Sequence, residues 1–128
     1  MTTPKHTATA VPADFRLPFP PSVNALYRAV GGRSILSAAY RAWKLEAGKV
    51  LMSQRPPKFA GQVSVEVQLC PPNKRRRDID NAGFKAVLDL LVSHQIIQGD
   101  DSTFVRSIKA SWVETGDPCR VTINGVTP

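Results

Sequence analysis

The sequence has few cysteines, no long apolar run and fewer acidic than basic residues, and each of these features narrows the class of protein. Its two cysteines, Cys70 and Cys119, form no CxxC or Cys/His pattern, which argues against a zinc site or a disulfide framework and favours a reducing cytoplasm. No stretch approaches the roughly 18 apolar residues of a membrane span, and residues 1–12 have no signal-peptide apolar region. A membrane partner is therefore not expected.

The chain also has no internal repeat and no glycine-rich phosphate loop, so neither a repeat architecture nor an organic cofactor is expected. Its 128 residues, 42% of them hydrophobic, have room for one domain with a modest core. We expect residues 1–12 to form a disordered tail and residues 13–128 to form that single domain.

Basic residues outnumber acidic ones by 17 to 10, which gives a formal net charge of +7. A surface of this sign attracts phosphate polymers, so a nucleic acid is the expected partner. The charge is densest in a run of four consecutive cations, and other basic residues are spread over the first half of the chain. The residues predicted to contact nucleic acid are Arg28, Arg33, Lys44, Lys74, Arg75, Arg76, Arg77 and Asn81.

The apolar patterns predict an α+β fold, a small mixed sheet with two main helices packed on it, because strands and helices do not alternate strictly. Ser37 is placed to cap the first helix, and Gly31-Gly32 favours a hairpin turn. We expect the last strand to run antiparallel to the one before it. Predicted strands cover residues 15–17, 63–69, 103–113 and 120–124, a predicted hairpin covers 27–36, and predicted helices cover 38–53 and 84–92.

Two aspartates directly follow the basic run, and an acidic pair lies about twenty residues later. Carboxylate oxygens are the ligands that Mg²⁺ prefers. If the segment before the second helix is extended, Asp78 and Asp80 point to the same side and can converge. The sequence therefore predicts a Mg²⁺ site formed by Asp78, Asp80 and Asp101, with Mn²⁺ as an alternative ion.

A metal ion in this position would polarise a phosphoryl oxygen and favour the ionisation of water, as phosphodiester hydrolysis requires. Lys85 is the only lysine in the second predicted helix, so we expect it to stabilise negative charge in the transition state or to hold the scissile phosphate. The adjacent arginines would bind neighbouring phosphates.

Each of these residues also has a purely structural interpretation. Asp78 or Asp80 would serve as a helix cap, the pair Asp100-Asp101 is common in turns, and Lys85 can form an ordinary surface ion pair with Asp89 four residues later. The basic run would then be a solvated loop. On that interpretation, the chain is a non-catalytic basic DNA-binding module.

The segment from Arg75 to Asn81, the lysine early in the next helix and the later acidic pair together resemble the RusA family of Holliday junction resolvases. The proline-rich opening from Leu17 to Asn24 is similar to that family as well, and the resemblance spans about residues 15–123. It implies a homodimeric, Mg²⁺-dependent endodeoxyribonuclease, bacterial or phage-encoded and frequently from a prophage. Such an enzyme cuts four-way DNA junctions by paired nicks in recombination and repair. The family's catalytic aspartates fall on Asp78, Asp80 and Asp101.

The resemblance includes one departure. In the family the essential lysine lies four residues after the second aspartate, but here Phe84 occupies that place and Lys85 comes one residue later. One residue is about 100° of rotation in a regular helix. Either the helix begins late enough to accommodate the extra residue, or a bulge absorbs it.

A homodimer is expected on geometric grounds too, because a symmetric junction is cut on two strands and one chain holds one carboxylate cluster. A nuclease acting on other branched DNA remains the alternative enzyme.

Overall fold

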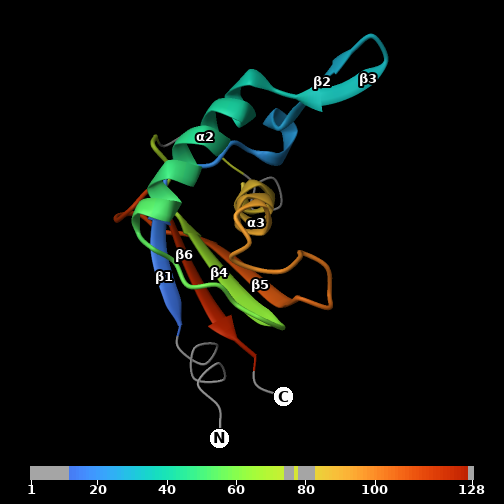
Figure 1. The fold of residues 1–128 in the computed structure, drawn as a ribbon. Coiled ribbons are helices and arrows are strands. Elements are labelled where there is room, and N and C mark those ends of the chain that lie inside the picture. The colour runs from blue at the N-terminus through green and yellow to red at the C-terminus, as the bar shows by residue number, and fades with distance from the viewer. Residues whose placement is uncertain (1–11, 74–76, 78–82, 127–128) are drawn as a thin grey trace, which may run out of the picture.

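The fold is a four-stranded mixed sheet with two helices on one of its faces (Figure 1). The computed structural model describes residues 12–73, 77 and 83–126. The four-stranded sheet and its two helices agree with the predicted small mixed sheet and two main helices. The elements are β1 (Ala13–Leu17), the 3-10 helix η1 (Val23–Ala25), β2 (Tyr27–Val30), β3 (Arg33–Leu36), α2 (Ala38–Ser53), β4 (Val63–Leu69), α3 (Phe84–Ser93), β5 (Val105–Trp112) and β6 (Cys119–Gly125).

The strand order in the sheet is β1-β6-β4-β5. β4 and β5 are parallel, which requires a crossover connection, and α3 lies in that connection. β6 runs opposite to β5, as predicted, but the two strands are not neighbours. Instead β6 pairs with β4 on one side and β1 on the other. The chain passes across the end of β4 between these two strands, so β4 lies between β5 and β6 in the sheet.

β2 and β3 form a separate hairpin that extends away from the sheet (Figure 1). Its turn is Gly31-Gly32, with φ angles of 56° and 78°. Two consecutive residues with positive φ match the twist of the flanking strands, and glycine adopts this conformation without steric cost. The base of the hairpin is closed by Ser37, whose N–H donates to the Leu26 carbonyl and whose hydroxyl donates to the Ala25 carbonyl.

α2 begins where the sequence predicted, and its first turn is capped by Ser37. The Ser37 Oγ accepts a hydrogen bond from the Tyr40 N–H at 3.0 Å. Such a cap satisfies one of the backbone donors that the first turn leaves unpaired. The hydroxyl therefore fixes both the base of the hairpin and the start of α2.

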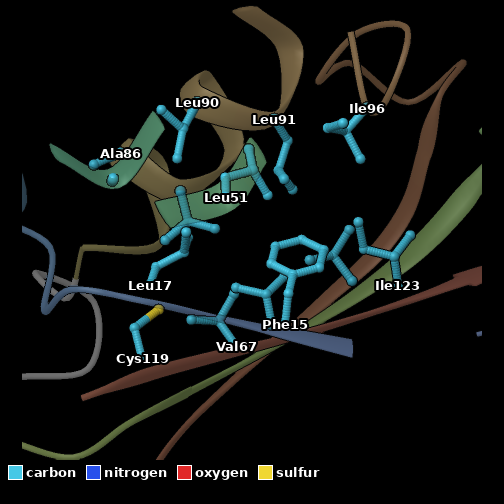
Figure 2. Packing of buried hydrophobic residues seen from close by; sticks show 14 of the residues in the cluster. Phe15, Leu17, Leu51, Val67, Ala86, Leu90, Leu91, Ile96, Cys119 and Ile123 are labelled. Atoms are coloured by element: carbon cyan, nitrogen blue, oxygen red, sulfur yellow. The ribbon is translucent and has the colours of Figure 1, made fainter. Parts of the chain in front are cut away.

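The core lies between the two helices and the covered face of the sheet (Figure 2). Buried and partly exposed residues alternate along β4, because successive side chains of a strand point to opposite faces. Figure 2 shows Val67 and Phe15 from the sheet facing Leu90 and Leu51 from the helices. All four side chains are at most 3% exposed. This packing fixes the positions of α2 and α3 on the sheet.

The opposite face of the sheet carries polar residues. It includes an ion pair between Arg120 in β6 and Asp14 in β1, which are diagonal cross-strand neighbours. Hydrogen bonding to Arg120 lowers the pKa of Asp14. Because both side chains are about half exposed and screened by solvent, this pair contributes little to stability.

Candidate active site

The start of α3 fixes the position of Lys85 within the helix. The helix begins at Phe84 with Gly83 as its N-cap, so Lys85 is the second helical residue. The segment between Asp80 and Gly83 that would contain the extra residue lies outside the described residues, so how it is accommodated remains a prediction. Since Gly83 occupies the cap position, neither Asp78 nor Asp80 is the N-cap residue of α3.

Gly83 packs closely against the proline-rich segment that follows β1. A Cβ atom on Gly83 would lie 2.6 Å from the Pro21 carbonyl oxygen and 2.6 Å from Cγ of Pro20. Both distances are shorter than real Cβ contacts, so a side chain at this position would displace the helix start. The prolines thus set the position from which α3 and Lys85 begin.

Lys85 belongs to a chain of polar contacts that joins the two helices. Its Nζ lies 3.5 Å from Oδ2 of Asp89, one helical turn further along α3. The same Oδ2 accepts a hydrogen bond of 2.9 Å from the hydroxyl of Tyr40 on α2. The ion pair expected from the four-residue spacing is therefore confirmed, and it is anchored by a tyrosine that the spacing did not reveal.

Tyr40 is almost fully buried, with 1% of its surface exposed. Burial, followed by its hydrogen bond to Asp89, raises its pKa well above the ordinary value for a tyrosine. The hydroxyl therefore remains protonated and acts only as a donor to the carboxylate. The ammonium group of Lys44 lies 5.3 Å from the centre of the Tyr40 ring, which is within cation–π range.

Asp101 lies in the turn that precedes β5. Its Oδ1 accepts a hydrogen bond of 2.8 Å from the Thr103 N–H, and its carbonyl accepts one from the Val105 N–H. The turn role expected for this acidic pair is confirmed. The Asp101 side chain is exposed, and its Oδ2 has no hydrogen bond to any residue that the structure describes. One carboxylate oxygen thus holds the turn while the other remains available for a cation.

Three of the predicted nucleic-acid contacts, Arg28, Arg33 and Lys44, lie on the hairpin and on α2. Both arginines are exposed on the hairpin, and Lys44 is half-buried beside Tyr40. Arg77 is also half-buried: its guanidinium donates to the backbone carbonyl and side chain of Asn73 and lies 5.6 Å from the Phe19 ring centre. Arg77 therefore has structural contacts of its own, whereas the hairpin arginines point into solvent.

The structure places Asp101 and Arg77 at opposite ends of β4. Asp101 precedes β5, whose first residue pairs with Val63 at the start of β4. Arg77 contacts Phe19, which follows the end of β1, and that end aligns through β6 with the end of β4. The seven residues of β4 span about 20 Å. Asp101 and Arg77 are thus separated within the described part of one chain.

The predicted residues Asp78, Asp80, Asn81, Lys74, Arg75 and Arg76 lie outside the described residues. Among the residues that the structure does describe, no group of three His, Cys, Asp or Glu side chains is close enough to hold a metal ion. Asp101 fits a ligand role through its exposed carboxylate oxygen. The convergence of the three aspartates remains a prediction.

Tyr40 and Gly83 were not identified as site residues from the sequence. Tyr40 lies 49 residues from Asp89, and no local pattern links the two. Gly83 carried a weak signal, because it occupies the position next to Phe84 where the expected lysine spacing is interrupted. The role of Tyr40 depends on a contact between α2 and α3, and that of Gly83 depends on a contact with the proline segment. Neither contact follows from the local sequence.

No helix in the part of the chain that the structure describes is long and apolar enough to cross a membrane. The family model described as "Endodeoxyribonuclease RusA" matches residues 18–124, which include both acidic segments and Lys85. Similar proteins named crossover junction endodeoxyribonuclease RusA occur in phages and in bacteria. The one from Enterobacteria phage HK97 is 30% identical over 105 residues, covering 80% of this chain and 86% of that protein.

The relatives from Enterobacteria phage 82 and Escherichia coli are 36% and 34% identical over 76 residues. Each of these alignments covers 59% of this chain and 62% of the relative. The family model extends over the hairpin, both helices and the strands β4, β5 and most of β6. On these matches, the chain belongs to the RusA family of endodeoxyribonucleases.

Proposed function

We propose that this protein is a metal-dependent endonuclease that resolves four-way DNA junctions by hydrolysing phosphodiester bonds on two strands, in recombination and repair. The observation that carries the proposal is the family match over residues 18–124, because it includes the acidic segments as well as both helices and most of the sheet. The relatives bear the name of crossover junction endodeoxyribonucleases. Their bacterial and phage origin supports action in a bacterial cytoplasm.

The carboxylates of Asp78, Asp80 and Asp101 would hold Mg²⁺ or Mn²⁺, which supplies a Lewis acid for phosphoryl oxygen and favours the ionisation of water. Lys85 would bind the scissile phosphate, since it is the second residue of α3, in the first turn, where the backbone N–H groups also favour anions. The basic residues on the hairpin, on α2 and before Asp78 would contact flanking phosphates.

The working enzyme would be a homodimer. A four-way junction needs two cuts related by two-fold symmetry, and a symmetric dimer places two sites at a fixed separation. Arg77 directly precedes Asp78 in the sequence, and its separation from Asp101 along β4 supports the same assembly. In a dimer, Asp101 of one chain can complete a site whose other carboxylates come from the second chain.

The proposal is tested with a synthetic four-way junction and a linear duplex of the same sequence, each with and without Mg²⁺. We expect the wild-type chain to cut the junction into duplexes only when Mg²⁺ is present, and to leave the linear duplex intact. The Asp80→Asn variant should bind the junction without cutting it. An uncut junction with the wild-type chain, or equal cutting by Asp80→Asn, would contradict a catalytic role and favour a binding module. Equal cutting of flapped DNA would favour a broader nuclease.

Replacing Arg75 and Arg76 with Ala should weaken junction binding and flatten its salt dependence. Each lost phosphate contact reduces the slope of log K against log salt by about 0.9. The measurement is a series of fluorescence titrations between low and moderate salt, without Mg²⁺. Arg77 is left in place in this double variant because it also contacts Asn73 and Phe19. Adding Arg77→Ala then shows how much loss of those structural contacts changes binding. An unchanged slope in the double variant would identify the run as a solvated loop.

A further inference from the structure

Tyr40 organises two cations by two different contacts. Its ring face lies under the ammonium group of Lys44, and its hydroxyl binds the carboxylate that pairs with Lys85. We propose that Tyr40 and Asp89 are positioning residues, which hold the Lys85 ammonium group in place for a phosphate of the DNA substrate. This inference rests on the proposed function, because it assigns a geometric requirement to the lysine of that reaction.

The anchor of this arrangement is rigid. Tyr40 is buried, its backbone N–H is bound by the Ser37 cap, and its ring packs against Trp43 with 6.5 Å between ring centres. Tyr27 packs against the same ring edge-on at 6.3 Å. A tyrosine held on so many sides has its hydroxyl in one place, so the position of the Asp89 oxygen is determined by α2 as well as by α3.

Asp89 transmits this position to Lys85 through a single atom. Its Oδ2 receives both the Tyr40 hydroxyl and the Lys85 ammonium group. In an isolated pair on a helix surface, both long side chains rotate freely, and the attraction is largely lost to solvent and side-chain entropy. Here the carboxylate is already ordered by the tyrosine, so only the lysine remains to be ordered. The phenol therefore makes the ion pair a better restraint than its spacing alone provides.

Lys85 is restrained without being sequestered. The Nζ–Oδ2 distance of 3.5 Å is long for a charged hydrogen bond, and 45% of the lysine side chain is exposed. An ammonium group has three donors, so contact with Asp89 leaves others for a phosphate oxygen. The contact thus limits where the cation can go but leaves it available to substrate.

The competing explanation is that the Tyr40–Asp89 hydrogen bond only ties α2 to α3. The two explanations differ in what they require of Lys85. A structural tie needs an acceptor for the hydroxyl and nothing more, whereas positioning needs a charged carboxylate and works only when a lysine is present. Variants that separate the acceptor from the charge therefore decide between them.

The first test compares Tyr40→Phe in two backgrounds by single-turnover junction cutting with excess enzyme and Mg²⁺. In the wild-type background we expect cutting to slow by about three- to tenfold, because the lysine is less well placed. The junction dissociation constant should change by less than about twofold. In a Lys85→Gln background the same substitution should cause no further slowing. An equal loss in both backgrounds would overturn the inference. Tyr27→Phe, which removes the only other tyrosine hydroxyl, is the matched control and should cut normally.

The second test uses Asp89→Asn, which keeps an acceptor for the Tyr40 hydroxyl and removes the charge that attracts Lys85. Positioning predicts slower cutting with an unchanged unfolding temperature. Wild-type cutting by Asp89→Asn would show that the contact serves only to join the helices. This variant also keeps the inference testable if Tyr40→Phe folds poorly.

A third readout needs no catalysis. Competitive reductive methylation, followed by mass spectrometry, gives the reactivity of the Lys85 amine relative to Lys109, which is 77% exposed on the other face of the sheet. Loss of the Tyr40 hydroxyl should raise the relative reactivity of Lys85 by about twofold or more, because its ion pair loosens. Unchanged labelling in Tyr40→Phe would overturn the inference even if the wild type cuts junctions. Failure of the wild type to cut would instead count against the proposed function.

Discussion

The Asp101→Asn variant is expected to cut a four-way junction at least about 100-fold more slowly than the wild type, a loss of about 2.7 kcal/mol in barrier stabilisation. The substitution removes the negative charge that would attract Mg²⁺ but keeps a side-chain oxygen at the same place. That oxygen can still accept the Thr103 N–H, so the turn before β5 should stay intact. Cutting rates measured over a range of Mg²⁺ concentrations test this, together with the thermal unfolding midpoint, which should not change.

The neighbouring Asp100→Asn variant is the control for this prediction. It removes a carboxylate from the same exposed turn, but from a residue outside the predicted ligand set. We expect it to cut at the wild-type rate. If Asp101→Asn cuts as fast as Asp100→Asn, then Asp101 is a turn residue and the ligand set is smaller than proposed.

Mixing two inactive variants extends the same prediction to the dimer. If each site combines Asp101 of one chain with Asp80 of the other, a mixed dimer of Asp101→Asn and Asp80→Asn chains has one doubly altered site and one intact site. We expect such a mixture to regain the ability to nick one strand of the junction. If all ligands of a site came from one chain, every site in the mixture would carry a substitution and no nicking would return.

The Leu51→Ala variant is expected to lose about 2–5 kcal/mol of unfolding free energy, which is a large share of the 5–15 kcal/mol typical of a domain. Leu51 is fully buried near the end of α2 and lies beside α3 residues in Figure 2. Truncating it removes apolar contacts and leaves a cavity between the helices and the sheet. Urea unfolding followed by circular dichroism gives the free energy directly.

Leu45→Ala on the same helix is the matched control, because 70% of Leu45 is exposed. Its free energy of unfolding should change by less than about 0.5 kcal/mol. A large loss with Leu45→Ala, dependent on protein concentration, would indicate that this side of α2 is buried in an assembly. Similar small losses from both variants would contradict the assignment of Leu51 to the core.

The features that the sequence predicted well are those fixed by neighbouring residues. α2 begins after Ser37 because the cap and the apolar spacing act within one turn, and the hairpin turns at Gly31-Gly32 because only glycine adopts that geometry easily. The strand β4 follows from its alternation for the same reason. Each of these decisions is local, so a single sequence was enough.

The features it predicted less well depend on distant partners. The position of β6 between β1 and β4 is set by pairing with residues up to about a hundred positions away, and no turn signal encodes that choice. Similarly, the spacing of Lys85 and Asp89 predicted their ion pair, but Tyr40 comes from another helix. Asp101 was predicted as a metal ligand from the chemistry of its carboxylate. That chemistry does not determine how far Asp101 lies from Arg77 in the fold.

Because Ser37 closes the base of the hairpin, the length and sequence of the β2–β3 arm can change independently of α2. Since both ends of the arm are fastened beside the first turn of α2, residues added or removed at the Gly31-Gly32 tip extend or shorten it in solvent without moving the helix. The reach and charge of the arm can therefore change during evolution while the frame that holds Lys85 stays the same. If the arm binds DNA as proposed, contact with the substrate and cleavage of the bond would be separately adjustable within one small chain.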